Sequence, residues 1–267
     1  MDYQVKQKPL ILVTNDDGIN SPGLAAAARA ALRVGEIVIA APNEQQTAMG
    51  RAYPDRADLG VIDTVSIDIG LENPVEAYAV HGSPGYTAAY GIAEIAPKKA
   101  GRKPDITVSG INTGANCGTS ITSSGTIGAA LESVDMKVPA LAMSQEVLNY
   151  DDRWPDFPGL DYVSAERATE YWLRYILNKG MPDEADFLNV NVPDTVVEPE
   201  DYLFTFLETH PYYKAQPVPE RDWGKPYRIR FDSEFGDKDA TEGSDIYTLQ
   251  FKRKTAVTPL KVDMTKR

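Results

Sequence analysis

The sequence predicts an α/β protein with a mostly parallel sheet, and three observations support this fold class. Apolar runs at 10–13, 36–41 and 105–109 have the length of buried strands. Each run is followed by a polar cluster, as at the carboxyl edge of an open α/β sheet. Beyond Asp194 the pattern changes to alternating strands. We therefore expect an α/β catalytic core over residues 1–195 and a β-rich extension over residues 196–267.

The composition fits a soluble globular protein that binds neither nucleic-acid polymers nor membranes. Of 267 residues, 42% are hydrophobic and 25% charged, and the formal net charge is -12. So acidic a chain lacks the basic surface that phosphate backbones require, although a small phosphorylated substrate is compatible if a cation offsets the charge. No run approaches the ~18 apolar residues of a membrane span. The single cysteine and the polar N-terminus, without a signal segment, predict a cytoplasmic location.

The first apolar run ends in an acidic turn. Residues 10–13 are followed by Thr14, Asn15, Asp16, Asp17 and Gly18. Neighbouring strand side chains point to opposite faces, so the two carboxylates can face one centre only if the backbone turns, as Gly18 permits. Two crowded carboxylates raise each other's pKa unless a cation lies between them, and Mg²⁺ or Mn²⁺ is the hard ion expected there. These residues alone leave open a capped turn with solvated aspartates.

A helix and a second strand follow the acidic turn. Ser21 as N-cap and Pro22 at the first helical position predict a helix that runs to Arg33, and residues 36–41 form the next strand. Such a strand–helix–strand unit is right-handed with parallel strands. The polar loop after the second strand therefore lies on the same edge of the sheet as the acidic turn. There Thr47 could reach an ion or a phosphate, or be an ordinary loop threonine.

The next segment predicts a hairpin and a helix. Residues 61–69 and 75–80 alternate apolar and polar side chains and are separated by a short turn. A helix then begins at the N-cap Ser83 and ends near Ile95. We interpret His81 as a turn residue, because nothing in the sequence pairs with it for catalysis.

Amides and hydroxyls follow the third buried strand. Asn112 and Asn116 lie among glycines after the strand at 104–112, and Ser123–Thr126 precede a helix over 127–134. Hydroxyls and a glycine at a helix N-terminus offer free N–H groups and a positive dipole end, which suit phosphate. A plain serine cap is the alternative, but it explains one hydroxyl and not three.

The rest of the chain completes the core and then forms the extension. We expect a loop over 149–161, followed by a long helix from its N-cap Ser164 to Asn178. His210 begins a proline-rich, aromatic loop and is interpreted as structural. The remaining expected elements are strands at 137–144, 187–192, 202–207, 227–231 and 255–260, the 202–207 and 227–231 pair being antiparallel, and a short helix that begins at Ser244 and Asp245.

A series of motifs spans the whole chain. They are NDDG (15–18), PG (22–23), AP (41–42), GSP (82–84), PDITVSGINTGAN (104–116), SSGTIGAALE (123–132), LNVNVP (188–193) and VTPL (257–260). In this order they resemble the SurE family, the stationary-phase survival 5'/3'-nucleotidases. The resemblance implies a three-layer α/β/α core and a C-terminal extension used in oligomer contacts, as in a homodimer or homotetramer. It also implies divalent-metal-dependent hydrolysis of phosphomonoesters, with nucleoside monophosphates as substrates.

The resemblance also carries residue roles by motif position. It implies that Asp16, Asp17, Asn112 and Thr47 bind one Mg²⁺ or Mn²⁺ per subunit. The family usually has serine where Thr47 lies, and the added methyl could shift the metal geometry. Loop 48–53 departs from the family's Gly- and Ser-rich stretch, which bears on substrate preference.

The chemistry expected of these residues is metal-assisted hydrolysis. The ion would neutralise the catalytic residues Asp16 and Asp17 and polarise a phosphoryl oxygen. Water or an aspartate could attack phosphorus, and we favour water, because an ion lowers the pKa of water bound to it. Phosphate oxygens would be held by a set of side chains and helix N–H groups. That set is Asn15, Asn116, Ser124, Gly125 and Thr126.

Three other functions fit parts of the sequence less well. A haloacid-dehalogenase-type phosphatase requires D-x-D, but Asn15 stands two residues before Asp17, so the nucleophile is missing. A serine hydrolase requires G-x-S-x-G and a partnered histidine, and neither histidine has that context. The alternative of a different class is a non-catalytic binding or assembly protein that keeps the fold.

Overall fold

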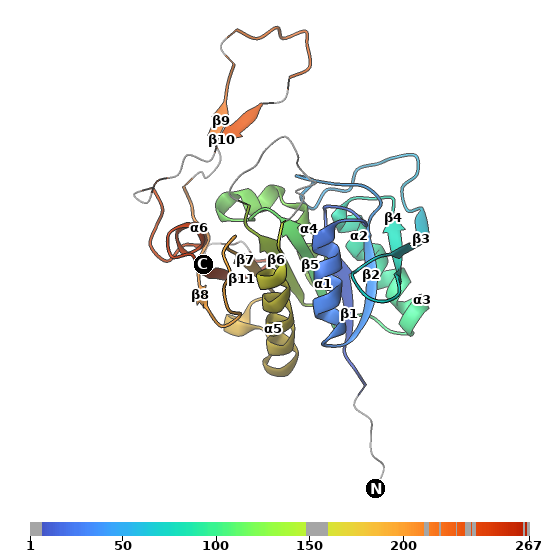
Figure 1. Cartoon of the computed structure of the whole chain (residues 1–267). Coiled ribbons are helices and arrows are strands. Elements are labelled where there is room, and N and C mark those ends of the chain that lie inside the picture. Colours follow the sequence, from blue (N-terminus) through green and yellow to red (C-terminus); the bar gives the residue numbers. More distant parts are fainter. Residues whose placement is uncertain are drawn as a thin grey trace.

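A twisted sheet runs through the computed structural model of the chain (Figure 1). The structure describes residues 7–147, 160–210, 214–218, 220–227, 229–232, 236, 239–263 and 265. Nine strands form this sheet: β1 (Leu10–Thr14), β2 (Glu36–Pro42), β3 (Ile62–Ile67), β4 (Val75–Val80), β5 (Ile106–Thr113), β6 (Ala140–Gln145), β7 (Phe187–Val192), β8 (Tyr202–Phe204) and β11 (Thr255–Leu260). Their order is β3-β4-β2-β1-β5-β6-β7-β11-β8.

The centre of the sheet is parallel, as the strand–helix–strand pattern predicts. Strands β4, β2, β1, β5, β6 and β7 pair parallel to one another. Only β3 against β4 and β11 against β7 are antiparallel within this sheet, over the part of the chain that the structure describes. The carboxyl ends of β1, β2 and β5 therefore meet at one edge, which brings their polar turns together.

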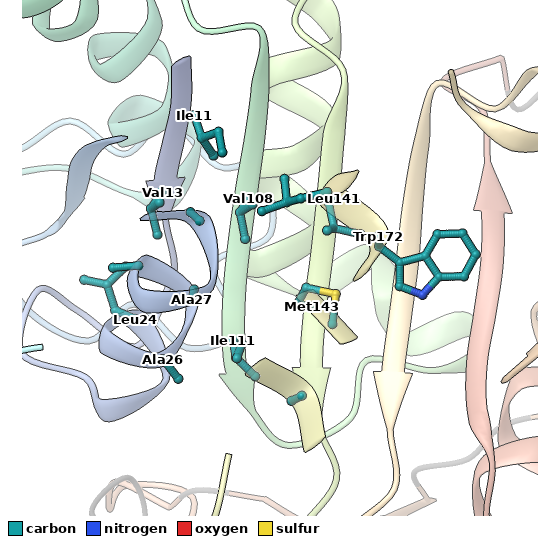
Figure 2. Packing of buried hydrophobic residues seen from close by; sticks show 14 of the residues in the cluster. Ile11, Val13, Leu24, Ala26, Ala27, Val108, Ile111, Leu141, Met143 and Trp172 are labelled. Carbon is teal, nitrogen blue, oxygen red and sulfur yellow. The ribbon is translucent and has the colours of Figure 1, made fainter. Parts of the chain in front are cut away.

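Helices cover both faces of the sheet and give the three-layer α/β/α architecture. Alternate residues of β1 belong to different cores. Ile11 and Val13 lie in the core on the face that α1 and α5 cover (Figure 2), while Leu10 and Leu12 face the helical stretch 84–100 on the other side. The helices are α1 (Pro22–Leu32), α2 (Pro84–Tyr90), α3 (Ala96–Ala100), α4 (Gly125–Asp135), α5 (Val163–Lys179) and α6 (Asp245–Gln250), and a π-helical turn (Gly91–Ile95) joins α2 to α3. None of the described helices has the length and apolar character that crossing a membrane requires.

Helix α5 begins differently from the sequence prediction. Its N-cap is Tyr162, which makes no side-chain capping bond, and the prediction of Ser164 as N-cap is wrong. The Ser164 hydroxyl accepts a hydrogen bond of 3.2 Å from the Val197 N–H instead, because tertiary contacts outweigh the local capping preference. The expected loop over 149–161 lies mostly outside the described residues. The aromatic residues Tyr171, Trp172 and Tyr175 of α5 pack toward the core, and Trp172 is fully buried.

The strands of the C-terminal extension divide between the main sheet and a separate two-stranded sheet. Strand β11 inserts between β7 and β8, and β8 pairs parallel to β11, so both extend the main sheet. The segment near residue 231 pairs antiparallel with an unexpected strand instead of with 202–207, which corrects the predicted pairing. These two strands, β9 (Lys214–Gln216) and β10 (Arg230–Asp232), project away from the main sheet in Figure 1.

Candidate active site

The acidic turn after β1 is closed by Asn15. Its Nδ2 donates to the Gly18 carbonyl at 3.1 Å, and its Oδ1 accepts from the Gly18 N–H at 3.2 Å. Gly18 has a φ of +95°, in the left-handed region that favours glycine. The backbone therefore turns where the sequence predicts, and the Asn15 amide, which is fully buried, is used in holding that turn.

Asp16 lies buried against the N-terminus of α4. The Thr126 hydroxyl donates a hydrogen bond of 2.7 Å to Asp16 Oδ1. Gly125 packs directly on the carboxylate, because it carries no side chain there. Burial and the charge of Asp17 raise the pKa of Asp16 to about 7, although the Thr126 bond opposes the shift. A positive partner beside Asp16 would therefore stabilise its charged form.

Asp17 presents a free oxygen to the same site. Its Oδ2 accepts a hydrogen bond of 3.0 Å from the Thr113 N–H at the end of β5. Its Oδ1 is buried and has no hydrogen-bond partner among the described residues. Burial raises the pKa of Asp17 to about 6, although the hydrogen bond from Thr113 opposes the shift. A buried carboxylate oxygen without a donor is costly unless something positive binds it.

Asn112 supplies a third oxygen at the end of β5. Its Nδ2 donates to the Gly114 carbonyl at 2.7 Å, which leaves its Oδ1 for another partner. Two carboxylates and an amide oxygen are the hard ligands that Mg²⁺ and Mn²⁺ prefer, so these residues fit a divalent cation. The described residues contain no competing cluster of three or more His, Cys, Asp or Glu side chains suited to a metal.

Thr47 lies on an exposed loop beside the acidic turn. The loop is anchored by the neighbouring Gln46, whose N–H donates to the Asp16 carbonyl at 2.7 Å. The loop is thus held at the site, and coordination by the Thr47 hydroxyl stays a prediction.

Four of the five residues predicted to hold phosphate lie at the N-terminus of α4, and the fifth, Asn15, closes the turn after β1. Ser124 Oγ accepts from the Ile127 N–H at 3.2 Å, so Ser124 caps the helix as the alternative interpretation expects. The first N–H groups of a helix have no partner within it, so those of Gly125 and Thr126 are available to a ligand. Asn116 Nδ2 donates to Thr126 Oγ1 at 3.3 Å and to Ser144 Oγ at 3.0 Å.

A cavity of about 200 Å³ opens beside the acidic turn. Polar groups line it, among them Asp17, Asn43, Gln45 and Thr113. Residues 19–22 also line a larger neighbouring cavity of about 570 Å³. A substrate whose phosphate reaches Asp17 thus has room for the rest of the molecule.

Both histidines are held in ion pairs. His81 Nδ1 lies 2.7 Å from Asp58 Oδ2 and its Nε2 lies 2.9 Å from Asp63 Oδ2, and these bonds raise the pKa of His81. His210 Nδ1 lies 3.0 Å from Glu208 Oε1. The structural interpretation of both residues therefore agrees with their contacts.

Several groups that form hydrogen bonds around the site were not predicted from the sequence. The Thr113 backbone bonds Asp17, Ser144 bonds Asn116, and two asparagines of β7 bond the Asn116 backbone. One signal was available for the last two, because LNVNVP places Asn189 and Asn191 in an otherwise apolar buried strand.

Comparisons with known proteins bear on this site. The family described as Survival protein SurE matches residues 11–213. A protein named 5'-nucleotidase SurE from Methanocella arvoryzae is 36% identical over 257 residues, which cover 96% of this chain and 92% of that protein. Another of that name from Methanobrevibacter smithii is 35% identical, covering 95% of each. The crystal structure of the SurE protein from Aquifex aeolicus matches with a TM-score of 0.73 and 27% identity, over 97% of this chain and 95% of that chain.

Proposed function

The chain belongs to the SurE family, and we propose that it is a divalent-metal-dependent phosphomonoesterase that hydrolyses nucleoside monophosphates to nucleoside and phosphate. Its relatives named 5'-nucleotidase SurE match nearly the whole chain, so the similarity extends over the complete fold and not over one segment of it. Asp16 and Asp17 are the proposed catalytic residues.

The single observation that carries the proposal is the pair of adjacent carboxylates, with Asp16 buried against the N-terminus of α4 and Asp17 half-buried beside it. One oxygen of Asp17 is buried without a hydrogen-bond partner among the described residues. Burial raises the pKa of both carboxyl groups, so a bound cation would favour their doubly charged state. A non-catalytic binding protein would not require this arrangement beside an anion-binding helix end.

The proposed cation is one Mg²⁺ or Mn²⁺ per subunit, held by Asp16, Asp17, Asn112 and Thr47. When bound, such an ion neutralises the carboxylates, polarises a phosphoryl oxygen and favours deprotonation of an attacking water.

The protein's own groups would orient the substrate. The first N–H groups of α4, at Gly125 and Thr126, would donate to phosphate oxygens and place the helix dipole behind them. Asn15, Asn116 and Ser124 complete the proposed phosphate side of the site. Asn15 and Ser124 would act through the backbone that they hold, since both side chains already have partners.

The substrate, the cellular location and the oligomeric state are part of the same proposal. We expect a small nucleoside monophosphate as substrate, a cytoplasmic location and a homodimer or homotetramer. The exposed aromatic residues of the extension support association, because groups of large exposed apolar side chains often mark an interaction surface.

Substrate profiling tests the proposal. The chelator-treated protein is assayed for phosphate release from nucleoside 5'- and 3'-monophosphates, with and without added Mg²⁺ or Mn²⁺. We expect release only with a metal. Failure to release phosphate from any nucleotide, with a cation demonstrably bound, would refute the activity but leave the metal site standing.

A further inference from the structure

Strand β7 carries two asparagines on the same face of the sheet. Asn189 and Asn191 are two residues apart, so their side chains share one face of the sheet. Both are fully buried, and the other four residues of β7 are apolar. A buried amide without hydrogen bonds is destabilising by a few kcal/mol, so such side chains persist in a core strand only with partners.

Both side chains reach one residue, Asn116, in the loop after β5. Asn191 Oδ1 accepts from the Asn116 N–H at 2.7 Å, and Asn191 Nδ2 donates to the Asn116 carbonyl at 3.0 Å. Asn189 Nδ2 donates to the same carbonyl at 2.8 Å. Three hydrogen bonds thus fix the backbone of one loop residue from a strand two places away in the sheet.

The side chain of Asn116 continues the chain of hydrogen bonds into the site. Its Nδ2 donates to Thr126 Oγ1, and Thr126 donates to Asp16 Oδ1 at 2.7 Å. The amide nitrogen of Asn116 sets the direction of this chain, because it can only donate. Thr126 therefore accepts from Asn116 and uses its own hydroxyl hydrogen on Asp16.

We propose that Asn189 and Asn191 are positioning residues for the reaction, acting on Asp16 through Asn116 and Thr126. The inference rests on the proposed function, in which Asp16 holds the metal and α4 receives the phosphate. Residues that orient metal ligands in this way tune affinity and activity without touching the ion. The β7 amides would hold the Asn116 side chain against Thr126, and Thr126 would then hold the Asp16 carboxylate at one angle to the cation.

A variant series tests this role against simple stabilisation of the sheet. Asn191→Leu removes two of the three bonds to Asn116, and Asn189→Leu removes one. Thr258→Val is the matched control, because Thr258 lies opposite Asn189 on β11, is equally buried and bonds only to Thr205 among the contacts described. Each variant is characterised by its melting temperature, by Mn²⁺ titration calorimetry, and by kcat and KM.

The positioning role predicts a specific loss. Asn191→Leu should weaken Mn²⁺ binding and lower kcat by roughly tenfold to a hundredfold, with a smaller loss for Asn189→Leu. Thr258→Val should lower the melting temperature and leave the Mn²⁺ Kd and kcat unchanged. If Asn191→Leu does not fold, Asn191→Ser is measured in its place, because it keeps a small polar group there. A folded Asn191 variant with wild-type Mn²⁺ Kd and kcat would overturn the proposal.

A double-mutant cycle identifies the path. If Asn191 acts through Thr126, adding Asn191→Leu to Thr126→Val should change the Mn²⁺ Kd by less than about twofold, whereas independent effects would multiply. Multiplying effects would overturn the proposed route. Absence of phosphatase activity in the wild-type protein would reject the proposed function alone, since the Mn²⁺ titrations still test the positioning of Asp16.

Discussion

A β-carbon on Gly125 would lie 2.7 Å from the Cβ of Asp16 and 2.8 Å from its Oδ2. The N-terminus of α4 therefore rests on the carboxylate at the end of β1, with no room for a side chain between them. The positive end of the helix dipole faces that carboxylate and favours its charged form, against the effect of burial. A helix end of the kind that can bind anions and a buried acid thus share one surface.

The first prediction concerns Gly125→Ala. The added methyl must displace Asp16 or the neighbouring Pro84 ring, whose Cγ would lie at 2.9 Å. We expect a loss of stability of about 1–3 kcal/mol from overpacking. Mn²⁺ affinity should also fall by at least about tenfold as Asp16 moves. Thermal unfolding and Mn²⁺ titration measure the two effects.

The matched control is Gly85→Ala, at the corresponding end of α2. A β-carbon there would meet only ordinary contacts, at 3.7 Å or more. This variant should keep wild-type Mn²⁺ affinity and gain a little stability, since alanine in a helix is favoured over glycine. Equal Mn²⁺ affinity in both alanine variants would contradict the close approach of α4 to Asp16.

The second prediction concerns acid stability at the base of the hairpin that carries β9 and β10. Glu208 is fully buried and accepts hydrogen bonds from the backbone N–H groups of Thr209, His210 and Thr241. Burial raises the pKa of Glu208, but the bonds from Thr241 and His210 outweigh it and lower the pKa to about 2. The folded pKa is thus below the unfolded value. The stabilisation is present above pH 4.5 and is lost as the pH falls toward 2.

Glu208→Gln should therefore destabilise the protein at pH 7 by about 1–3 kcal/mol, because the amide N–H₂ cannot accept from these donors. The difference between variant and wild type should shrink as the pH falls from 4.5 toward 2. Urea unfolding at pH 7 and pH 3 checks both statements. A difference that stays constant with pH would mean that the ionised form of Glu208 contributes nothing.

Local pattern predicted most of the core and its polar edge. The alternation of apolar strands and capped helices placed β1, α1, β2 and β5, and parallel pairing then brought Asp16 and Asn112 to one edge. The sequence did not indicate where β11 would insert, because neighbours in a sheet are chosen by long-range packing. The same limit applies to Ser164, whose hydroxyl bonds Val197 instead of capping α5.

The contacts around the candidate site also include local ones, which the sequence predicts, and long-range ones, which it does not. The Asn15–Gly18 turn is local and follows from NDDG. The bonds from Asn191 to Asn116 and from Thr126 to Asp16 join residues 75 and 110 positions apart, so no local pattern contains them. Two amides in an apolar strand were the only trace that β7 contributes to this network.

The third prediction concerns association. Several large apolar side chains of the extension are exposed, including Trp223 at 90% and Phe206 at 50%. We expect them to lie partly in a subunit interface, so light scattering at micromolar concentration should give at least twice the 29.3 kDa chain mass. Trp223→Ser should weaken association, because interface tryptophans often dominate binding energy. Val61→Ser, a substitution at an exposed apolar residue of the core, is the control and should leave the mass unchanged. A wild-type mass of a single chain would contradict the prediction.

The most direct test of the central claim is phosphate release from a nucleoside 5'-monophosphate by three proteins at matched Mn²⁺: the wild type, Asp17→Asn and Asp63→Asn. Asp63 is an exposed carboxylate paired with His81, so it controls for loss of one negative charge. We predict that Asp17→Asn loses Mn²⁺-dependent release while remaining folded, and that Asp63→Asn retains it. Wild-type release by a folded Asp17→Asn protein would contradict the account of a metal-dependent phosphatase built on the acidic turn.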